Sequence, residues 1–376
     1  MIYLDNAATT KPSVSAFDKA RVFVTERYFN PSALYNEGFA LQSELKKARS
    51  ALLSPVADES AFELIFTSCG TEADNQAIFS FARRGNVVTT AGEHSAVFAA
   101  FAELKNRGAV ETRIAPLNKD GSVDVDALCA LVDNKTSLVS VMHVNNELGS
   151  INDVNDIAKR VKQINPRVIF HVDGVQAYGK LAFRLAKEID AYSISAHKIG
   201  GLKGVGALIK RKSLQIAPYI IGGGQESGKR SGTENVFGIM QFAYAAQEKF
   251  LLLRQDYARL KDYRERLWEL LDKDVYTRIS PENGTPYILT VAAAGLRGEV
   301  LLHMANDKGL IIGTGSACSS NAKSRYSKAV IACGYDEKTA DGVLRISFSN
   351  ETTQEEIERA AAILNDIGND LKRRMQ

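Results

Sequence analysis

A lysine, Lys198, follows a run with the pattern of a buried strand, DAYSISAH, and two glycines come just after it. A lysine at a strand end usually extends into solvent, so other residues must argue for chemistry. Asp173 is one of them, because it closes VIFHVD, the most apolar of the predicted strands. A buried carboxylate needs a cationic or hydrogen-bonding partner, which could be a core Lys or Arg or a protonated pyridine nitrogen.

A third candidate for chemistry, a helix start that could bind a phosphate, follows the run FELIFTS. Gly70 and Thr71, in SCGTEADN, open a predicted helix whose free N–H groups and dipole favour a phosphate, although helix capping explains Thr71 equally well. A lysine for a Schiff base, an acid for a pyridine nitrogen and a helix N-terminus for a phosphate are together what pyridoxal phosphate (PLP) requires. His94, after NVVTT, is by itself more typical of a structural histidine.

Composition excludes several other classes. The 376 residues carry 47 Lys and Arg against 44 Asp and Glu, which leaves no field for nucleic acid or an anionic membrane. The sequence has no uninterrupted apolar stretch of the ~18 residues that indicates a membrane span, and Asp5 stands where a signal peptide needs apolar residues. We therefore expect a cytoplasmic enzyme with a small-molecule substrate. We expect reduced cysteines, because the four cysteines form no C-x-x-C pair. We also predict no metal site.

The elements that position these residues alternate along the chain. Strand-like runs separated by helix-like ones predict an α/β fold with a mostly parallel central sheet covered on both faces, and ligands bind beyond the carboxyl ends of such strands. The predicted strands are FELIFTS, NVVTT, TSLVSVM, RVIFHVD, DAYSISA and GVGALIK. A long helical pattern over 235–272 leads to a smaller α+β unit. We predict a large domain over 16–250 and a small domain made of 1–15 and 251–376.

Motifs spread along the chain, in a fixed order, carry a resemblance to a known family. They are YLDNAATT, FNPSALY, FTSCGTEADN, GEHSAV, VNNELG, HVDGVQ, SISAHK, GGGQESGKRSGTEN, GTGSACSS and LRISFS. Through them the chain resembles, over nearly its whole length, the NifS-like cysteine desulfurases of the fold-type I PLP enzymes (class-V aminotransferases). The resemblance implies removal of sulfur from L-cysteine, a homodimer, and a sulfur-acceptor protein such as an iron-sulfur scaffold or a tRNA-thiolating enzyme.

The same resemblance implies a role for each matching residue. Lys198 is then the Schiff-base lysine, Asp173 contacts the pyridine nitrogen and His94 stacks on the ring. The residues expected on the ring hydroxyl and the phosphate are Asn146, Gln176, Gly70, Thr71, Ser195 and His197, with Thr233 reaching the phosphate from the other subunit. Arg345 is expected to pair with the substrate carboxylate, with Asn30 nearby.

Cys318 separates this chemistry from other PLP reactions. It lies in GTGSACSSNAKS, a stretch of small and polar residues that predicts a loop. Its thiolate could take sulfur from cysteine as a persulfide and release alanine. Cys129 and Cys333 lie in apolar runs and are interpreted as small core residues, and Cys69 as a structural residue of the phosphate turn.

Two alternatives remain at this point. GGQESGKR, from Gly223 to Arg230, approaches the nucleotide-binding pattern G-x-x-x-x-G-K-[ST] after the strand-like IAPYII, but Arg230 replaces the hydroxyl that holds magnesium. The second alternative is another PLP reaction, either lysis of selenocysteine or a transamination, which does not need Cys318.

Overall fold

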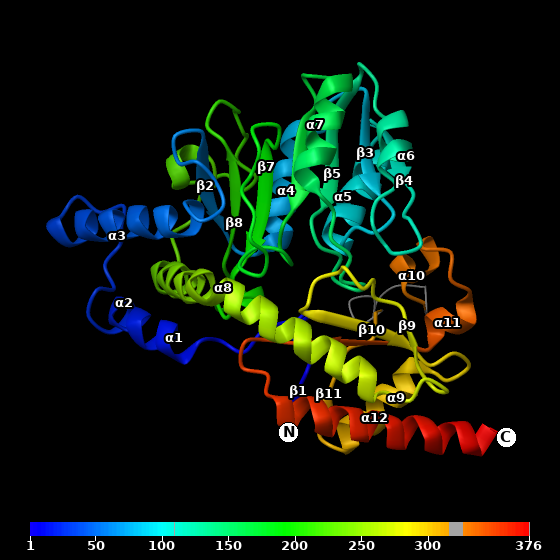
Figure 1. Ribbon diagram of the computed structural model, residues 1–376. Helices are drawn as coiled ribbons and strands as arrows, with labels where there is room; N and C mark the ends of the chain where they lie inside the picture. Colours follow the sequence, from blue (N-terminus) through cyan, green and yellow to red (C-terminus); the bar gives the residue numbers. More distant parts are fainter. Residues whose placement is uncertain (109, 316–325, 376) are drawn as a thin grey trace.

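The computed structural model describes residues 1–108, 110–315 and 326–375. Two bodies are visible in it, a large one around a broad sheet and a smaller one that holds both termini (Figure 1). The helix α8 (Val236–Leu270) runs from one body to the other.

The broad sheet has seven strands in the order β2-β8-β7-β6-β5-β3-β4. All neighbours from β7 to β4 pair in parallel, and only β8 runs against its neighbours. The predicted mostly parallel sheet is therefore confirmed. The strands are β2 (Phe62–Thr67), β3 (Asn86–Thr90), β4 (Glu111–Ala115), β5 (Thr136–Met142), β6 (Ile169–Asp173), β7 (Ala191–Ser195) and β8 (Gly206–Arg211).

Alternating side chains of these strands enter two different cores. Val87 and Leu138 pack in one hydrophobic cluster with α4 and α5, while their neighbours Val88 and Val139 pack in the larger cluster on the other face with α7. Figure 1 shows α4 and α5 behind the sheet and α7 in front of it. Burial on both faces explains why the strand sequences are almost continuously apolar. The helices of this body are α1 (Val14–Ala20), α2 (Val22–Thr25), α3 (Asn36–Leu53), α4 (Gly70–Phe81), α5 (Ser95–Asn106), α6 (Val125–Ala130) and α7 (Val154–Ile164).

The six predicted strands all occur, and β4 was missed. Its sequence, ETRIA, is charged and half-exposed because it forms an edge of the sheet. The prediction of a strand at IAPYII was wrong, because residues 216–221 form no strand. The basic residues of GGQESGKR are engaged in ion pairs, Lys229 with Glu63 at 2.8 Å and Arg230 with Glu72 at 2.9 Å. The structural context of a nucleotide-binding loop is therefore missing.

The small body packs a three-stranded antiparallel sheet, β12-β10-β9, against helices. Its N-terminal strand β1 pairs in parallel with β11, far away in sequence. A capping box opens α12, since Glu356 N–H donates to Thr353 Oγ1 at 3.2 Å and Thr353 N–H to Glu356 Oε2 at 3.0 Å. The elements are β1 (Ile2–Tyr3), β9 (Thr277–Arg278), β10 (Ile288–Ala292), β11 (Leu310–Ile311), β12 (Val343–Ser347), α9 (Gly298–Asp307), α10 (Lys328–Ala332), α11 (Glu337–Asp341) and α12 (Gln354–Met375).

The helix α8 belongs to both hydrophobic cores. Its first half, with Ile239 and Phe242, packs in the core of the large body, and its second half, with Leu260 and Leu267, packs in the core of the small one. The exact domain limits stay a prediction. Among the residues that the structure describes, none of the helices has both the length and the apolar composition needed to cross a bilayer.

Candidate active site

A pocket of about 270 Å³ lies where the parallel strands end. It brings together residues from the large body, from the N-terminal segment and from β12. Ten of the predicted site residues line it, namely Gly70, Thr71, His94, Asn146, Asp173, Gln176, Ser195, His197, Lys198 and Arg345. The two of these ten residues that lie farthest apart in the chain, Gly70 and Arg345, are separated by 275 positions and meet in one cavity.

Lys198 closes a single 3₁₀ turn, Ala196–Lys198, that directly follows β7. Its ammonium group is held by the N-terminal segment, because Nζ donates to the carbonyl oxygens of Ala7 and Ala8, both at 2.8 Å. The lysine is only partly buried, and its amine is directed by backbone carbonyls rather than lying in bulk solvent. This arrangement suits a lysine that reacts inside a pocket.

Asp173 ends β6, the strand that pairs with β7, and its carboxylate is buried. Burial raises the pKa of Asp173, and the opposing influences are His94, the N–H of Val175 and Lys198. Val175 N–H donates to Oδ1 at 3.0 Å. A carboxylate with one backbone donor in a buried site favours a further proton donor or cation in the pocket.

His94 caps the N-terminus of α5 with its ring. The N–H of Ala96 donates to His94 Nδ1 at 3.2 Å, so Nδ1 carries no proton and the proton of the neutral ring is on Nε2. Burial lowers the pKa of His94, an effect that Asp173 opposes and Lys198 reinforces. The histidine is thus a neutral ring with a defined tautomer beside the buried acid, and not the isolated structural histidine that its position alone suggested.

The helix N-terminus of α4 forms another wall of the pocket. A Cβ on Gly70 would lie 2.8 Å from Val175 Cγ2, so the close approach of α4 to the loop after β6 requires glycine. Ser195 Oγ is buried and has no hydrogen-bond partner among the described residues. His197 Nδ1 lies 3.2 Å from Thr9 Oγ1, and burial, followed by Lys198, lowers the pKa of His197 to about 4.

Arg345, on β12, forms the opposite wall and is almost completely buried. One terminal nitrogen donates to Asp5 Oδ1 at 2.8 Å and the other to the carbonyl oxygen of Asn146 at 3.0 Å. Its Nε is buried without a partner among the described residues. The guanidinium is therefore fixed in orientation and retains a donor.

Three supporting residues were not identified from the sequence. Asp5 lies in YLDNAATT, but only the fold shows that it holds Arg345. Lys180 donates from Nζ to Gln176 Oε1 at 2.8 Å, which leaves Gln176 Nε2 to donate to Ala7 O at 2.8 Å. The i, i+4 spacing in QAYGK was the available signal for this contact. Burial lowers the pKa of Lys180 well below its usual value.

Asp74 is the third of these residues, and it lines the pocket one turn into α4. Its Oδ1 lies 3.5 Å from Nε2 of the fully buried His171. Burial lowers the pKa of His171 to about 3, which keeps this ring neutral. Burial and the neighbouring Asp173 raise the pKa of Asp74 well above its usual value, so the two acids oppose each other's ionisation.

The remaining predicted residues are not brought into this pocket. Asn30 is exposed and its Oδ1 accepts from Ser32 N–H at 2.9 Å, while Thr233 is also exposed. Cys318 lies outside the described residues. Of the other cysteines, Cys333 is buried in an apolar cluster as predicted, and burial raises its pKa to about 12. Cys129 packs against the large core but is only partly buried, so it is not the core residue that was predicted. Cys69, interpreted as structural, lines the pocket at the N-cap of α4.

Comparison with known proteins identifies the family of this chain. A model of the aminotransferase class-V family matches residues 2–360. The chain belongs to the class-V aminotransferase family. It is 36% identical over 380 residues to a cysteine desulfurase of Nostoc sp., covering 98% of this chain and 92% of the relative.

Solved structures agree with this assignment to the class-V aminotransferases. A NifS-like protein has a TM-score of 0.91 and 33% identity, with 97% of this chain and 98% of that one covered. A structure described as SspA in complex with cysteine has a TM-score of 0.81 and 25% identity, covering 94% of this chain and 100% of that one. The predicted NifS-like resemblance and the fold class are confirmed. The chain is an enzyme of a family that depends on PLP.

Proposed function

We propose that this enzyme is a cysteine desulfurase, which uses PLP to convert L-cysteine to L-alanine and leaves the sulfur as a persulfide on Cys318. The observation that carries the proposal is the single pocket in which Lys198, Asp173, His94 and Arg345 meet. The cysteine desulfurases among its relatives, and the neighbouring structure described with cysteine, support the substrate.

The residues of the pocket fit PLP. Ser195 Oγ, buried without a partner among the described residues, and the N-terminus of α4 at Gly70 and Thr71 provide donors for a phosphate. Asp173 is a buried acid that has only one hydrogen bond from the described part of the protein, which suits a pyridinium N–H. PLP, when bound, supplies an electron sink for chemistry at the substrate's α carbon.

The residues that would hold PLP divide by function. Lys198 would bind it covalently, Asp173 would keep its ring nitrogen protonated, and His94 would cover the ring. Gln176 and Asn146 would contact the ring hydroxyl side, with the Gln176 amide oriented by Lys180. The phosphate would be held by Gly70, Thr71, Ser195, His197 and, from a second copy of the chain, Thr233.

Arg345 and His94 act on the substrate. The spare Nε of Arg345, in a guanidinium already fixed by Asp5, would hold the carboxylate of cysteine, with Asn30 nearby. The tautomer of His94 confines its proton exchange to Nε2, because Nδ1 accepts from Ala96.

Cys318 would complete the sulfur transfer. Its thiolate attacks the sulfur of the bound cysteine, the bond between that sulfur and the substrate's β carbon breaks, and the β carbon keeps the electron pair and takes up a proton. Cysteine and a thiol thus become alanine and a persulfide, with the sulfur oxidised and the carbon reduced. The persulfide would pass to an acceptor protein in iron-sulfur cluster assembly or tRNA thiolation.

A homodimer is part of the proposal. Large apolar side chains are exposed in two segments of the large body, residues 28–35 and 219–221. They include Tyr28 (70% exposed) and Leu34 (90%) in the first segment and Ile221 (86%) in the second. The second segment lies shortly before Thr233, which is exposed and outside the pocket of its own chain. Association through these segments supports a role of Thr233 in the partner's site.

The decisive experiment replaces Cys318 by serine. The variant should keep the yellow cofactor and bind cysteine, detected as a spectral shift, but lose alanine formation, because a hydroxyl cannot accept the sulfur. After one turnover of the parent enzyme, mass spectrometry should find one extra sulfur on the Cys318 peptide. Cys129→Ser is the matched control and should behave like the parent.

The same assay distinguishes the alternative reactions. Parent activity in Cys318→Ser, or the extra sulfur on Cys69, would exclude the proposed sulfur transfer. A selenocysteine lyase would be identified by two results together. Neither the parent nor Cys318→Ser would use cysteine as a substrate, and Cys318→Ser would cleave selenocysteine at the parent rate. Accumulation of pyridoxamine phosphate would indicate a transaminase.

A further inference from the structure

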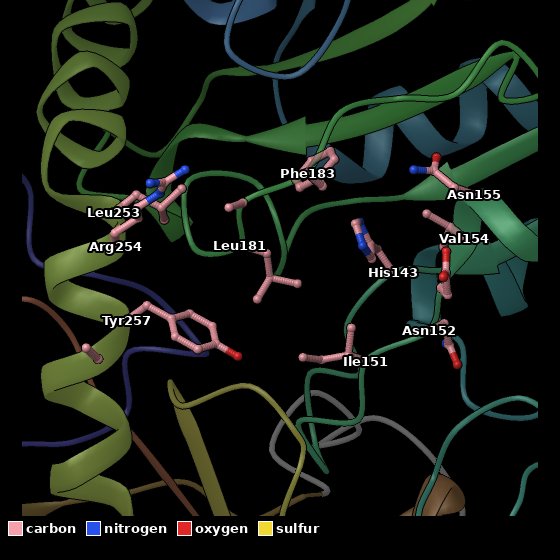
Figure 2. Close-up of a pocket in the computed structure, with 13 residues that line it drawn as sticks. His143, Ile151, Asn152, Val154, Asn155, Leu181, Phe183, Leu253, Arg254 and Tyr257 are labelled. Carbon is pink, nitrogen blue, oxygen red and sulfur yellow. The ribbon is translucent and has the colours of Figure 1, made fainter.

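A second pocket, of about 560 Å³, lies between α8 and the loop that joins β5 to α7 (Figure 2). His143, which lines it, directly follows Met142, which lines the Lys198 pocket. The two pockets therefore adjoin the same strand end but share no lining residue among those described. The volume is in the range of cavities that bind small organic molecules, ~300 to 1,000 Å³.

The walls of this pocket are mostly apolar. Figure 2 shows Leu181 and Phe183 in the middle of the pocket. On one side of them lies the β5–α7 loop with Ile151, and on the other side lies the helix α8 with Leu253 and Tyr257. Leu181 and Phe183 belong to a small hydrophobic cluster that Tyr257 also contacts. Such walls favour a ligand with an aromatic or aliphatic body.

Arg254 supplies a cation at the α8 side of the pocket. Its side chain has no ion pair or hydrogen bond within the described part of the chain, whereas the neighbouring Arg259 contacts Asp256 and the carbonyl oxygen of Asn350. Asp153, the only acid among the described lining residues, caps α7 and forms no ion pair with Arg254. The charge on Arg254 is therefore available to an anionic group.

Two hydrogen-bonding groups complete the lining. His143 Nδ1 lies 2.9 Å from the hydroxyl of Tyr192, and burial lowers the pKa of His143 to about 4, so the ring is neutral at pH 7. The direction of this bond depends on which ring nitrogen carries the proton, and Nε2 makes no hydrogen bond to a described residue. The hydroxyl of Tyr257 extends from α8 across the pocket in Figure 2.

We propose that this pocket binds a small organic acid, with its carboxylate on Arg254 and its apolar body between Phe183, Leu181 and Tyr257. The lining favours a monocarboxylate over a dicarboxylate, because Asp153, at the N-terminus of α7, also lines the pocket and would repel a second negative charge. This site is independent of the proposed sulfur chemistry, and its residues take no part in that mechanism.

The test uses the PLP-loaded enzyme and three acids, namely 3-phenylpropionate, indole-3-acetate and octanoate, each with its primary amide. Titration calorimetry should detect binding of at least one acid, and the amide should bind at least threefold more weakly because it lacks the charge. Arg254→Gln should weaken the acid at least threefold and leave the amide unchanged. Arg266→Gln, on the same helix but outside the pocket, is the matched control and should bind as the parent does.

A second variant tests the location. Ala258 lines the pocket and is exposed, so Ala258→Trp should fill the space without disturbing the core and abolish binding of acid and amide alike. Carboxylates could also bind at Arg345 in the catalytic pocket. Binding that persists unchanged in both Arg254→Gln and Ala258→Trp would come from Arg345 and would overturn the proposal. The proposal would also be overturned if none of the three acids bound the parent enzyme at 10 mM, roughly the limit at which fragment-sized ligands bind.

Discussion

The two ends of the Lys198 pocket are built in different ways. At the end formed by the large body, Asp173 and Ser195 end the neighbouring strands β6 and β7, and Lys198 lies in the turn after β7, so that each residue is placed by a local strand-to-loop transition. At the other end, Arg345 is held by Asp5, which is 340 positions away. The first end is therefore a property of a parallel sheet, while the second depends on the packing of the N-terminal segment against β12.

This difference predicts how the two ends respond to substitution. Residues of the sheet end would contact the cofactor itself, so their loss should affect the chemical step. Residues of the β12 end would position the substrate, so their loss should affect the Michaelis constant first. Three substitutions test the contrast, in order of decreasing effect, and a fourth tests the burial of Glu93 behind the sheet end.

Lys198→Ala should abolish turnover, because no other lysine lines the pocket in the described residues. In the parent enzyme, borohydride should remove the visible absorption and leave the reduced cofactor bonded to Lys198, which peptide mapping can verify. Alanine formation at the parent rate by the variant, or attachment at Lys180, would show that the sheet end does not have the proposed role.

Asp173→Asn should fold normally but lose a factor of about 10 to 1,000 in kcat, since a neutral amide does not stabilise a protonated ring nitrogen. The measurement is steady-state alanine formation, with the absorption spectrum as the check on cofactor binding. An active variant with an unchanged spectrum would leave Asp173 as a structural acid, balanced within the core by Lys198 and the Val175 N–H.

Asp5→Asn should raise the KM for cysteine roughly tenfold and change kcat little, because it weakens a charge-assisted hydrogen bond that orients Arg345. Glu351→Gln is a matched control, because it removes the exposed ion pair of Glu351 with Lys11 and should have no effect. A fall in kcat with an unchanged KM in Asp5→Asn would show that the two ends do not differ as described.

Glu93→Gln should change only the pH dependence of stability. Burial raises the pKa of Glu93 from 4.5 to about 8, an effect that hydrogen bonds from Thr90 and Met142 oppose. The folded protein then keeps this proton over a range in which the unfolded chain releases it, so the free energy of unfolding falls as pH rises between those values.

The isosteric amide in Glu93→Gln removes this contribution, whose slope is at most ~1.4 kcal/mol per pH unit. Urea midpoints of the parent should therefore fall more steeply than those of the variant between pH 5 and 8. Parallel pH profiles of the two proteins would contradict a protonated Glu93.

Much of the sheet end was predictable because its information is local. Six strands were recognised from apolar runs, and the order of polar residues at their ends correctly placed Gly70, Asp173 and Lys198 together. β4 was missed because an edge strand needs no apolar face, and IAPYII was taken for a strand because an apolar run does not reveal whether it has a pairing partner.

The sequence by itself determined which chemical groups the enzyme has: a lysine, a buried acid and a helix N-terminus whose spacing follows from the repeat of strand and helix. Only the tertiary structure decided how they are supported. The hydrogen bond of Ala96 that sets the tautomer of His94, the contact of Lys180 with Gln176 and the pairing of Asp5 with Arg345 each depend on distances in space. Burial is also a property of the fold. It raises the pKa values of the acids Asp173 and Glu93 and lowers the pKa of the base His94, because it disfavours the charged form of each group.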